Sequence, residues 1–459
     1  MKAGQKPSAP PQAASRKSSA GAEDGLWQRV FAVSFGAFLG LSLLKFGNPP
    51  IMEKWVTRPE GFFEFVFAYP WPIAWAYGLL ILVTISGWAA GSRRLGLPFW
   101  LLALPLAWFL WEFIAGLQSV DWSLTKATLM HFAACVACFY LGVFSLSGIR
   151  KTALFWSGII CGFVLVLVTG LEQHFGGLKE TRQYFLTYIY PQMKEVPPGY
   201  LQKISSSRIF GTLFYPNALA GAILLLLPPI LAFLWGLRER FTVGARRLLV
   251  GIAAVGGLSC LFWSGSKGGW LLALLMGLIV LLRLKFSGAV KLSLIVAVLV
   301  VGLAGFFVRY LGYFHKGATS VSARFDYWQA AVQITKEHPV FGTGPGTFFI
   351  PYQKIKRPES EPSRLTHNDY LEQASDSGIP GLLFYASFIV GGLVWIARRK
   401  DFLNNWQTFA VWLGVLGWAL QSLMEFALYI PALSWSAFAF LGWMMGSSKS
   451  EVRNPNGSC

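Results

Sequence analysis

The sequence predicts an all-α, polytopic integral membrane protein with about 12 transmembrane helices and a partly helical loop domain outside the membrane. Of its 459 residues, 54% are hydrophobic, 16% are aromatic and only 13% are charged. This composition is typical of a membrane protein. Runs of about 20 apolar residues are long enough to cross a bilayer, and a helix satisfies its own backbone hydrogen bonds in hydrocarbon.

The apolar runs divide the chain into a transmembrane domain, residues 26–446, and two short tails. Residues 1–25 are rich in Ala, Ser, Pro and Lys and contain too little apolar surface to fold, so we expect a disordered cytoplasmic tail. Residues 447–459 are the second predicted cytoplasmic tail. The predicted spans cover approximately residues 27–46, 73–91, 97–117, 125–146, 152–171, 217–236, 247–264, 269–284, 290–308, 379–397, 406–424 and 428–446.

The distribution of Lys and Arg predicts the orientation, because short basic loops are retained in the cytoplasm. The short connections on one side of the predicted membrane hold few basic residues, whereas those on the other side hold clusters. Both termini are therefore predicted to be cytoplasmic. The clusters are Arg93 and Arg94; Arg150 and Lys151; Arg238, Arg240, Arg246 and Arg247; Arg283, Lys285 and Lys291; and Arg398, Arg399 and Lys400.

Two outer connections, about residues 172–216 and 309–378, are too long to be simple turns, and long loops are usually functional. The second contains a predicted amphipathic helix that lies near the outer membrane surface, with its apolar face on the span bundle or in the lipid headgroups, and that ends before Pro339. A shorter helix follows and ends at Gly378, where the chain re-enters the membrane. The apolar residues at helical spacing in the surface helix are Val321, Phe325, Trp328, Val332 and Ile334.

Most other reactive side chains favour structural interpretations. Cys135 and Cys138 form a lone C-x-x-C within the fourth predicted span, which favours packing over a metal or redox site. His131 and His174 lie near the outer ends of predicted spans, where a structural role is favoured. No His, Asp or Glu cluster has the spacing that would demand a metal.

Four segments together carry a resemblance to a known family. They are SRIFGTLFYPN (207–217), SGSKGGW (264–270), ARFDYWQAAVQITKEHPVFGTGPGTF (323–348) and HNDYLEQASDSGIPG (367–381). In this order, over about residues 200–390, they resemble the signature of the O-antigen ligase and O-antigen polymerase family, the Wzy_C-type lipid-linked oligosaccharide transferases. Residues 1–150 share only hydrophobic helices with that family.

The resemblance implies a bacterial inner-membrane protein with a periplasmic active site and a GT-C-like fold. Its members transfer a glycan from an undecaprenyl pyrophosphate carrier to an acceptor hydroxyl, which implies a metal-independent, inverting glycosyltransferase without a cofactor. The expected partners are the carrier-linked glycan, an acceptor glycolipid or glycan, and membrane lipids. Nucleic acid is excluded by location.

The resemblance also implies the site residues. Arg208 and Arg324 match the family's loop arginines, expected to bind the pyrophosphate, and His367 matches the histidine of its H-N motif, expected to be catalytic. Where the family often has Ser-Arg-Gly, this chain has Lys267 in the middle position. The positive charge is kept there, but the planar two-pronged donor is lost.

The same residue types suit the chemistry independently of the family. A pyrophosphate leaving group gains negative charge as the sugar–oxygen bond breaks, and fixed cationic donors lower that barrier. A histidine, with an ordinary pKa of about 6.5, can take the proton of the acceptor hydroxyl. His367 as base and His367 as a protonated phosphate ligand both remain open. The arginines alone would equally fit contacts to lipid phosphates.

Several polar residues are candidates to support this site. Asn368 and Asp369 adjoin the histidine, although Asn368 would also suit a helix N-cap. Glu425 ends the eleventh predicted span and Glu112 lies in the third. Carboxyl groups are costly in a membrane, so these two are candidates for supporting the site or binding the acceptor, or they form a packed polar pair.

Three functions fit these observations. A ligase would attach the glycan to a lipid A core or another acceptor, including protein in an O-oligosaccharyltransferase. A polymerase would use another lipid-linked unit as acceptor, in O-antigen or exopolysaccharide synthesis. A flippase for the lipid-linked sugar fits least well, because it predicts ionisable residues deep within the spans, and the candidate residues here lie in outer loops.

Overall fold

The computed structural model describes residues 24–56, 58–67, 70–91, 97–184, 186–187, 190, 205–315, 319–399 and 402–447. Its regular secondary structure over these residues is helical, without strands, which confirms the all-α prediction. Nearly all of the two predicted tails, the basic residues Arg93, Arg94 and Lys400, and part of the first long loop lie outside the described residues.

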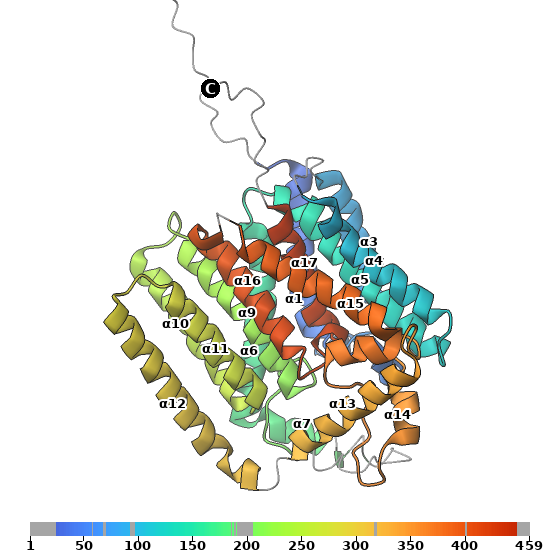
Figure 1. Ribbon diagram of the computed structural model, residues 1–459. Helices are drawn as coiled ribbons and strands as arrows, with labels where there is room; N and C mark the ends of the chain where they lie inside the picture. The colour runs from blue at the N-terminus through green and yellow to red at the C-terminus, as the bar shows by residue number, and fades with distance from the viewer. Residues whose placement is uncertain are drawn as a thin grey trace, which may run out of the picture.

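The long helices form one bundle (Figure 1). Nine helices of the described chain are long and apolar enough to cross a membrane, so the protein is a multi-pass membrane protein. The nine are α1 (Leu26–Lys45), α3 (Ile73–Ala90), α4 (Phe99–Gly116), α5 (Trp122–Phe144), α6 (Ala153–Glu172), α9 (Pro216–Gly236), α10 (Val243–Trp263), α12 (Gly288–His315) and α15 (Asp369–Ala397).

Three further predicted spans coincide with shorter helices. These are α11 (Lys267–Arg283), α16 (Trp406–Gln421) and α17 (Pro431–Gly446), with 17, 16 and 16 residues. The total of about 12 spans therefore stays a prediction. All but two of the residues of α17 are buried, because it runs through the centre of the bundle against α5 and α16. In contrast, α12 packs on α11 at the edge and exposes most of its apolar surface.

Small residues allow the closest helix contact near the N-terminus. Helix α1 crosses α6 at Gly36 and Gly40 on one side and at Gly158 and Gly162 on the other. A Cβ atom on Gly36 would lie 2.2 Å from the carbonyl oxygen of Phe155, so no larger residue fits at this crossing. Such spacing of small residues lets backbones approach within a bilayer, where packing rather than water exclusion drives association.

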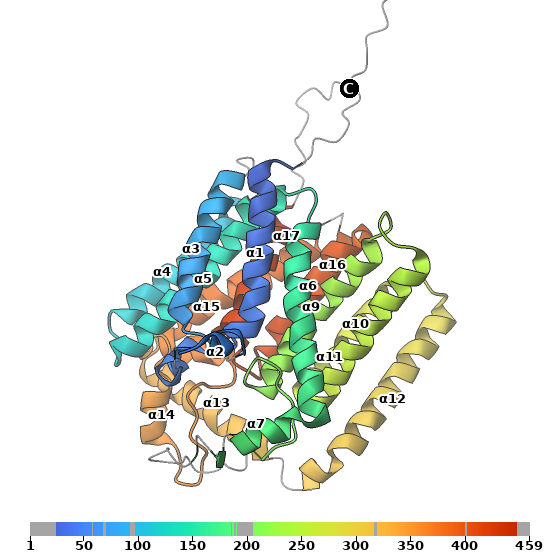
Figure 2. The same ribbon diagram turned by 180° about the vertical axis from the view of Figure 1, so that it is seen from behind.

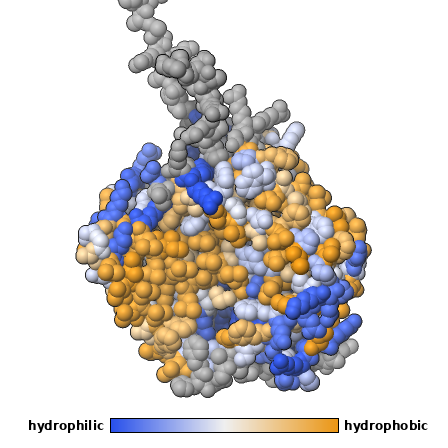
Figure 3. All heavy atoms as spheres, viewed as in Figure 1, coloured by the Kyte–Doolittle hydropathy of each residue, from blue (hydrophilic) through white to orange (hydrophobic). Residues whose placement is uncertain are grey.

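The two ends of the bundle differ in character. The beginning of α1 and the end of α17 lie at one end, and the loops that carry the basic clusters 238–247 and 283–285 lie there too (Figures 1 and 2). At the opposite end are α7 (Leu178–Tyr184), α13 (Thr319–Glu337) and α14 (Phe349–Ile355). Between the two ends, Figure 3 shows a broad apolar area, as expected for lipid contact.

The predicted surface helix is α13. The side of α13 that packs on the protein lies next to the side that carries most of the predicted apolar residues. Its buried residues Ala323, Tyr327, Ala331 and Ile334 pack with α14 and the start of α15. Of the apolar residues singled out in the sequence, Ile334 is buried and Trp328 half-buried, but Val321, Phe325 and Val332 are exposed. Their side of α13 is available for lipid headgroups.

The break before the tenth predicted span also lies where the sequence indicates. Helix α15 changes direction at Gly378, whose φ of 73° is non-helical, and Pro380 follows. A Cβ atom at this position would lie 2.1 Å from the carbonyl oxygen of Val340. Only glycine combines this left-handed conformation with such a close approach. The residues before the break, 369–377, are thereby directed toward the end of the bundle that holds α13 and α14.

Candidate functional site

The structure brings Arg208 onto the turn between α10 and α11. Its Nε–H donates to the carbonyl oxygen of Ser264 (2.7 Å), and its Nη2–H donates to Oδ1 of Asn217 (2.7 Å) at the start of α9. Burial lowers the pKa of the Arg208 guanidinium, and the charge of Glu425 partly offsets this. The side chain is therefore held at both ends of its guanidinium by oxygen acceptors.

Gly265 makes room for this arginine. It has a φ of 61°, and a Cβ atom there would lie 3.2 Å from Cγ and Nε of Arg208. We expect Gly265→Ala to destabilise the protein by about 1 kcal/mol through its left-handed backbone and to displace Arg208. The measurement is the thermal midpoint of purified protein. Gly251→Ala, at a helical glycine with open space beside it, is the control and should not lower the thermal midpoint.

Arg324 lies near the beginning of α13 and reaches across to the segment after α16. Its Nε–H donates to the carbonyl oxygen of Met424 (2.9 Å) and its Nη1–H to that of Ser320 (3.0 Å). Its Nη2 forms an ion pair with Oε1 of Glu425. All three nitrogens of the guanidinium therefore have a defined partner, and the side chain is fixed in one orientation.

His367 lies in the turn that leads into α15. Its backbone has a φ of 54°, a left-handed conformation that is uncommon for residues other than glycine and costs about 1–3 kcal/mol. Strained residues of this kind persist where the surroundings fix them, often at functional sites. The imidazole ring stacks on Tyr327 (5.7 Å between centroids) and meets Phe426 edge to face (4.8 Å).

The residues around His367 hold this turn in place. Asn368 caps α15, since its Oδ1 accepts hydrogen bonds from the backbone N–H groups of Tyr370 and Leu371. The hydroxyl of Thr366 donates to the carbonyl oxygen of Asn368 (2.7 Å), and its backbone N–H donates to Oε2 of the buried Glu372. Of the two interpretations of Asn368, the structure shows the N-cap directly, and the cap orients the turn that carries His367.

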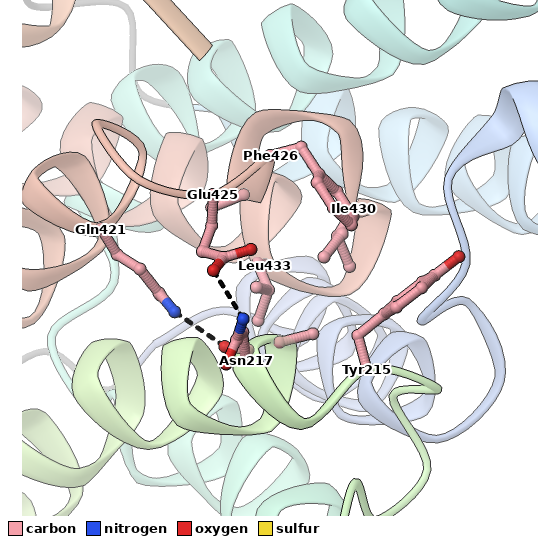
Figure 4. Close-up of a pocket in the computed structure, with 9 residues that line it drawn as sticks. Tyr215, Asn217, Gln421, Glu425, Phe426, Ile430 and Leu433 are labelled. Atoms are coloured by element: carbon pink, nitrogen blue, oxygen red, sulfur yellow. Dashed lines mark hydrogen bonds between the residues drawn. The ribbon is translucent and has the colours of Figure 1, made fainter. Parts of the chain in front are cut away.

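Glu425 contacts residues from each of these segments. Its Oε2 lies 3.1 Å from Nδ1 of His367, and its Oε1 pairs with Arg324 and accepts a hydrogen bond from Nδ2 of Asn217 (2.6 Å). Since Asn217 also binds Arg208, one carboxylate joins both arginines and the histidine. Figure 4 shows the Asn217–Glu425 contact. The Glu425 side chain is 13% exposed, and that of His367 is 28% exposed.

The surroundings keep Glu425 charged. Burial alone would raise the pKa of its carboxyl group, but the hydrogen bond from His367 and the positive charge of Arg324 outweigh burial, and the pKa is lowered from its ordinary value of 4.5. A carboxylate with a lowered pKa stabilises the folded state above its ordinary pKa. This contribution is lost as the pH falls through the lowered value.

We therefore expect Glu425→Gln to destabilise the protein at pH 7 by about 1–3 kcal/mol, because it leaves the charged guanidinium of Arg324 without its carboxylate. The difference in thermal midpoint between wild type and the variant should be full at neutral pH and should shrink below about pH 4.5. Glu359→Gln, at an exposed position in the same outer region, is the control. A pH-independent difference would contradict the charge assigned to Glu425.

Lys267 lies next to this group at the start of α11. Its Nζ lies 3.7 Å from the ring centroid of Tyr313 and 5.2 Å from that of Tyr310, both on α12. The positive charges of Arg208, Arg324 and Arg309 act on it. Four basic side chains, those of Arg208, Arg324, Arg309 and Lys267, are thus close enough to one another to interact, which suits an anionic ligand.

The other candidate carboxyl groups lie behind the site. Asp369 is buried, and its Oδ2 accepts a hydrogen bond from the backbone N–H of Leu428 (2.7 Å), while its own N–H donates to Ser422 (2.8 Å). It thus holds the segment that contains Glu425. Glu112 accepts a hydrogen bond from Ser377 (2.5 Å) deeper in the bundle. Within the described residues, no three His, Cys, Asp or Glu side chains are arranged to hold a metal ion.

Asn217 and Arg309 were missed by sequence reasoning. Asn217 is the last residue of the SRIFGTLFYPN segment, so its place in that motif was the available signal. Arg309 stands at the outer end of α12, with its guanidinium 5.8 Å from the ring of Tyr310. As an isolated arginine at a helix end, it has no pattern that distinguishes it from an interfacial anchor.

A pocket of only about 10 Å³ adjoins Glu425 and is lined by Tyr215, Asn217, Gln421 and Phe426 among others (Figure 4). This volume is about that of one water molecule. The pocket is too small for a larger ligand, and His367 is the more exposed member of the His367–Glu425 pair.

Comparison with known proteins adds a family. Residues 252–386 match the family model described as O-Antigen ligase. A protein of Haemophilus influenzae (strain ATCC 51907 / DSM 11121 / KW20 / Rd), described as an uncharacterized protein, is 29% identical over 164 residues, which cover 31% of this chain. The match spans 41% of that relative's length. The chain is therefore similar to the O-antigen ligase family over residues 252–386, a segment that includes Lys267, Arg324 and His367.

Proposed function

We propose that this protein is an O-antigen ligase-like glycosyltransferase that moves a glycan from an undecaprenyl pyrophosphate carrier to an acceptor hydroxyl. One observation carries the proposal: the Glu425 carboxylate binds His367 and Arg324 directly and Arg208 through Asn217. A base and two phosphate-binding groups are thereby fixed in one place. The match of residues 252–386 to the O-antigen ligase family supports the same class of reaction.

The arginines supply electrostatic stabilisation in this proposal. When the bond between the anomeric carbon and the phosphate oxygen breaks, negative charge develops on the leaving pyrophosphate. Arg208 and Arg324 are already fixed by Ser264, Met424 and Glu425, so little reorganisation is needed to meet that charge. Lys267 adds a third positive charge nearby. Phosphate oxygens would take over or share the positions at which the guanidinium groups now meet protein oxygens.

His367 accepts the proton of the acceptor hydroxyl. With Nδ1–H donating to the Glu425 carboxylate, Nε2 carries the lone pair, and the carboxylate stabilises the imidazolium that forms. The acceptor oxygen then bonds to the anomeric carbon as the pyrophosphate departs from the opposite face. A single displacement of this kind inverts the anomeric configuration. The proton ends on Nε2, and no step requires a metal or a cofactor.

The proposed location is the bacterial inner membrane, with the site on the periplasmic side. The basic loops lie at the same end of the bundle as the described chain ends, and the site lies near the opposite end (Figures 1 and 2). The rule that basic loops stay in the cytoplasm supports this orientation, with both termini cytoplasmic. The carrier's lipid tail would lie in the membrane beside α12, whose outer end carries Arg309 and Tyr310 near Lys267.

The test of this function is a transfer assay with purified protein and a lipid pyrophosphate-linked oligosaccharide. EDTA is present to remove metal ions. Two acceptors are offered separately, a lipid A core and a second lipid-linked oligosaccharide. Glycan on the lipid A core is the expected result and identifies a ligase. Elongated lipid-linked chains would instead identify a polymerase with the same chemistry. No product with either acceptor, at a donor concentration that saturates binding, would contradict the proposed transfer, and a requirement for metal would contradict the mechanism.

A further inference from the structure

A second possible binding site lies at the end of the bundle opposite His367. A groove of about 560 Å³ opens between the ends of α9, α11 and α16. Its volume is within the range of ligand-binding clefts. Its apolar wall includes Phe233, Leu237 and Leu284, and its polar lining includes Arg238 and Gln407. The candidate transfer site uses none of these residues.

Two tryptophans in the groove lining each carry an arginine on the ring. Trp235 is 42% exposed and has the guanidinium of Arg246 at 5.1 Å from its ring centroid. Trp406 is 48% exposed and has that of Arg283 at 4.3 Å. Tryptophan side chains prefer the depth of lipid headgroups, where one part of the ring is apolar and the N–H remains wet. The groove is therefore framed at headgroup depth by two aromatic–cation pairs.

The charge beside the groove favours an anion. The connection at residues 237–247 contains four arginines against one acidic residue, Glu239. Arg246 is more than nine-tenths buried; its Nη1–H donates to the carbonyl oxygen of Trp235 (2.8 Å). Its buried Nε–H has no hydrogen-bond partner among the described residues. Arg246 does not line the groove, so it contributes its charge and holds Trp235 in place, and Arg238 is the arginine in the groove lining.

We propose that this groove binds an anionic glycerophospholipid. The phosphate lies against Arg238, close to the Arg246–Trp235 pair, and one acyl chain runs along Phe233, Leu237 and Leu284. Basic pockets between transmembrane helices suit anionic headgroups, whereas a zwitterionic headgroup gains less from them. The groove is separated from the candidate transfer site by the length of the bundle (Figure 1), so this binding is independent of the proposed function.

Native mass spectrometry of the full-length, delipidated protein tests the proposal with two probes, dioleoyl phosphatidylglycerol and dioleoyl phosphatidylcholine. We expect tighter binding of phosphatidylglycerol. Arg238→Ala should weaken it about fivefold, as expected for one basic residue near the surface. Arg240→Ala removes the same charge two residues away, outside the groove lining, and should have a much smaller effect.

The contribution of the tryptophans that line the groove is tested in the same way. Trp406→Ala should lower phosphatidylglycerol binding, whereas Trp88→Ala, at an exposed tryptophan near the same end of the bundle, should not. Unchanged thermal midpoints establish that the variants fold. Equal binding of the two lipids, or equal effects of Arg238→Ala and Arg240→Ala, would overturn the proposal. None of these binding measurements depends on glycan transfer. The transfer assay therefore tests the proposed function separately from the lipid-binding site.

Discussion

His367→Ala is expected to lower glycan transfer by about 10²- to 10⁴-fold, the contribution typical of a positioned general base. Binding of the carrier-linked donor should change little, because the arginines that meet the pyrophosphate remain tied to Ser264, Met424 and Glu425. The measurement is the transfer rate at saturating donor, together with the dissociation constant of the donor. Alanine keeps the left-handed backbone of this position and does not relieve it, so the thermal midpoint is measured alongside to establish that the variant folds.

The control for this variant is His338→Ala. His338 is an exposed histidine just after α13, outside the Glu425 group. Its removal should leave transfer intact. If His367→Ala instead weakens donor binding as much as it weakens transfer, His367 acts as a phosphate ligand and the base assignment is wrong. If it leaves the transfer rate unchanged, the histidine has no part in the reaction.

Arg324→Lys is expected to lower transfer by about 10²-fold while keeping the positive charge. The guanidinium of Arg324 uses three nitrogens at once, toward Met424, Ser320 and Glu425. A lysine ammonium is a point charge on a flexible chain and cannot reproduce this planar set of donors. Donor binding should weaken as well, because the same group is expected to meet a phosphate oxygen.

The matched control is Arg357→Lys, an equivalent change at an exposed arginine on the same side of the protein. Arg357→Lys should change neither the transfer rate nor the binding of the donor. A near-normal transfer rate for Arg324→Lys would mean that charge alone is sufficient at this position. The bidentate clamp would then be wrong, although the proposed reaction could still take place.

Local sequence signals were enough to predict much of the fold. Gly378 followed closely by Pro380 predicted the break before the tenth span, and the structure confirms it through the left-handed φ of Gly378. The side of α13 that packs on the protein was harder to predict. That side combines Ala323 and Ala331 with Tyr327 and Ile334, whereas Phe325, which dominates the apolar pattern, remains exposed. Alanine is small and tyrosine is partly polar, so hydrophobicity alone does not reveal this side.

The residues of the candidate site could be proposed from the sequence, but the contacts that connect them could not. Arg208, Arg324 and His367 stand in recognisable motifs. The carboxylate that joins them does not, because Glu425 and Asn217 are separated by 208 positions in the chain and meet only through the fold. The sequence suggested a supporting role for Glu425 because a carboxyl group is costly at a span end. That argument applied equally to Glu112, which lies deeper and binds Ser377 instead.

The central claim is that Arg208, Arg324 and His367 form one transfer site around Glu425. An experimental structure of the protein with a non-transferable phosphonate analogue of the lipid pyrophosphate-linked donor tests it most directly. We predict that the diphosphate group lies within hydrogen-bonding distance of Arg208 and Arg324, with the first sugar next to His367. A diphosphate group bound away from both arginines would contradict the claim.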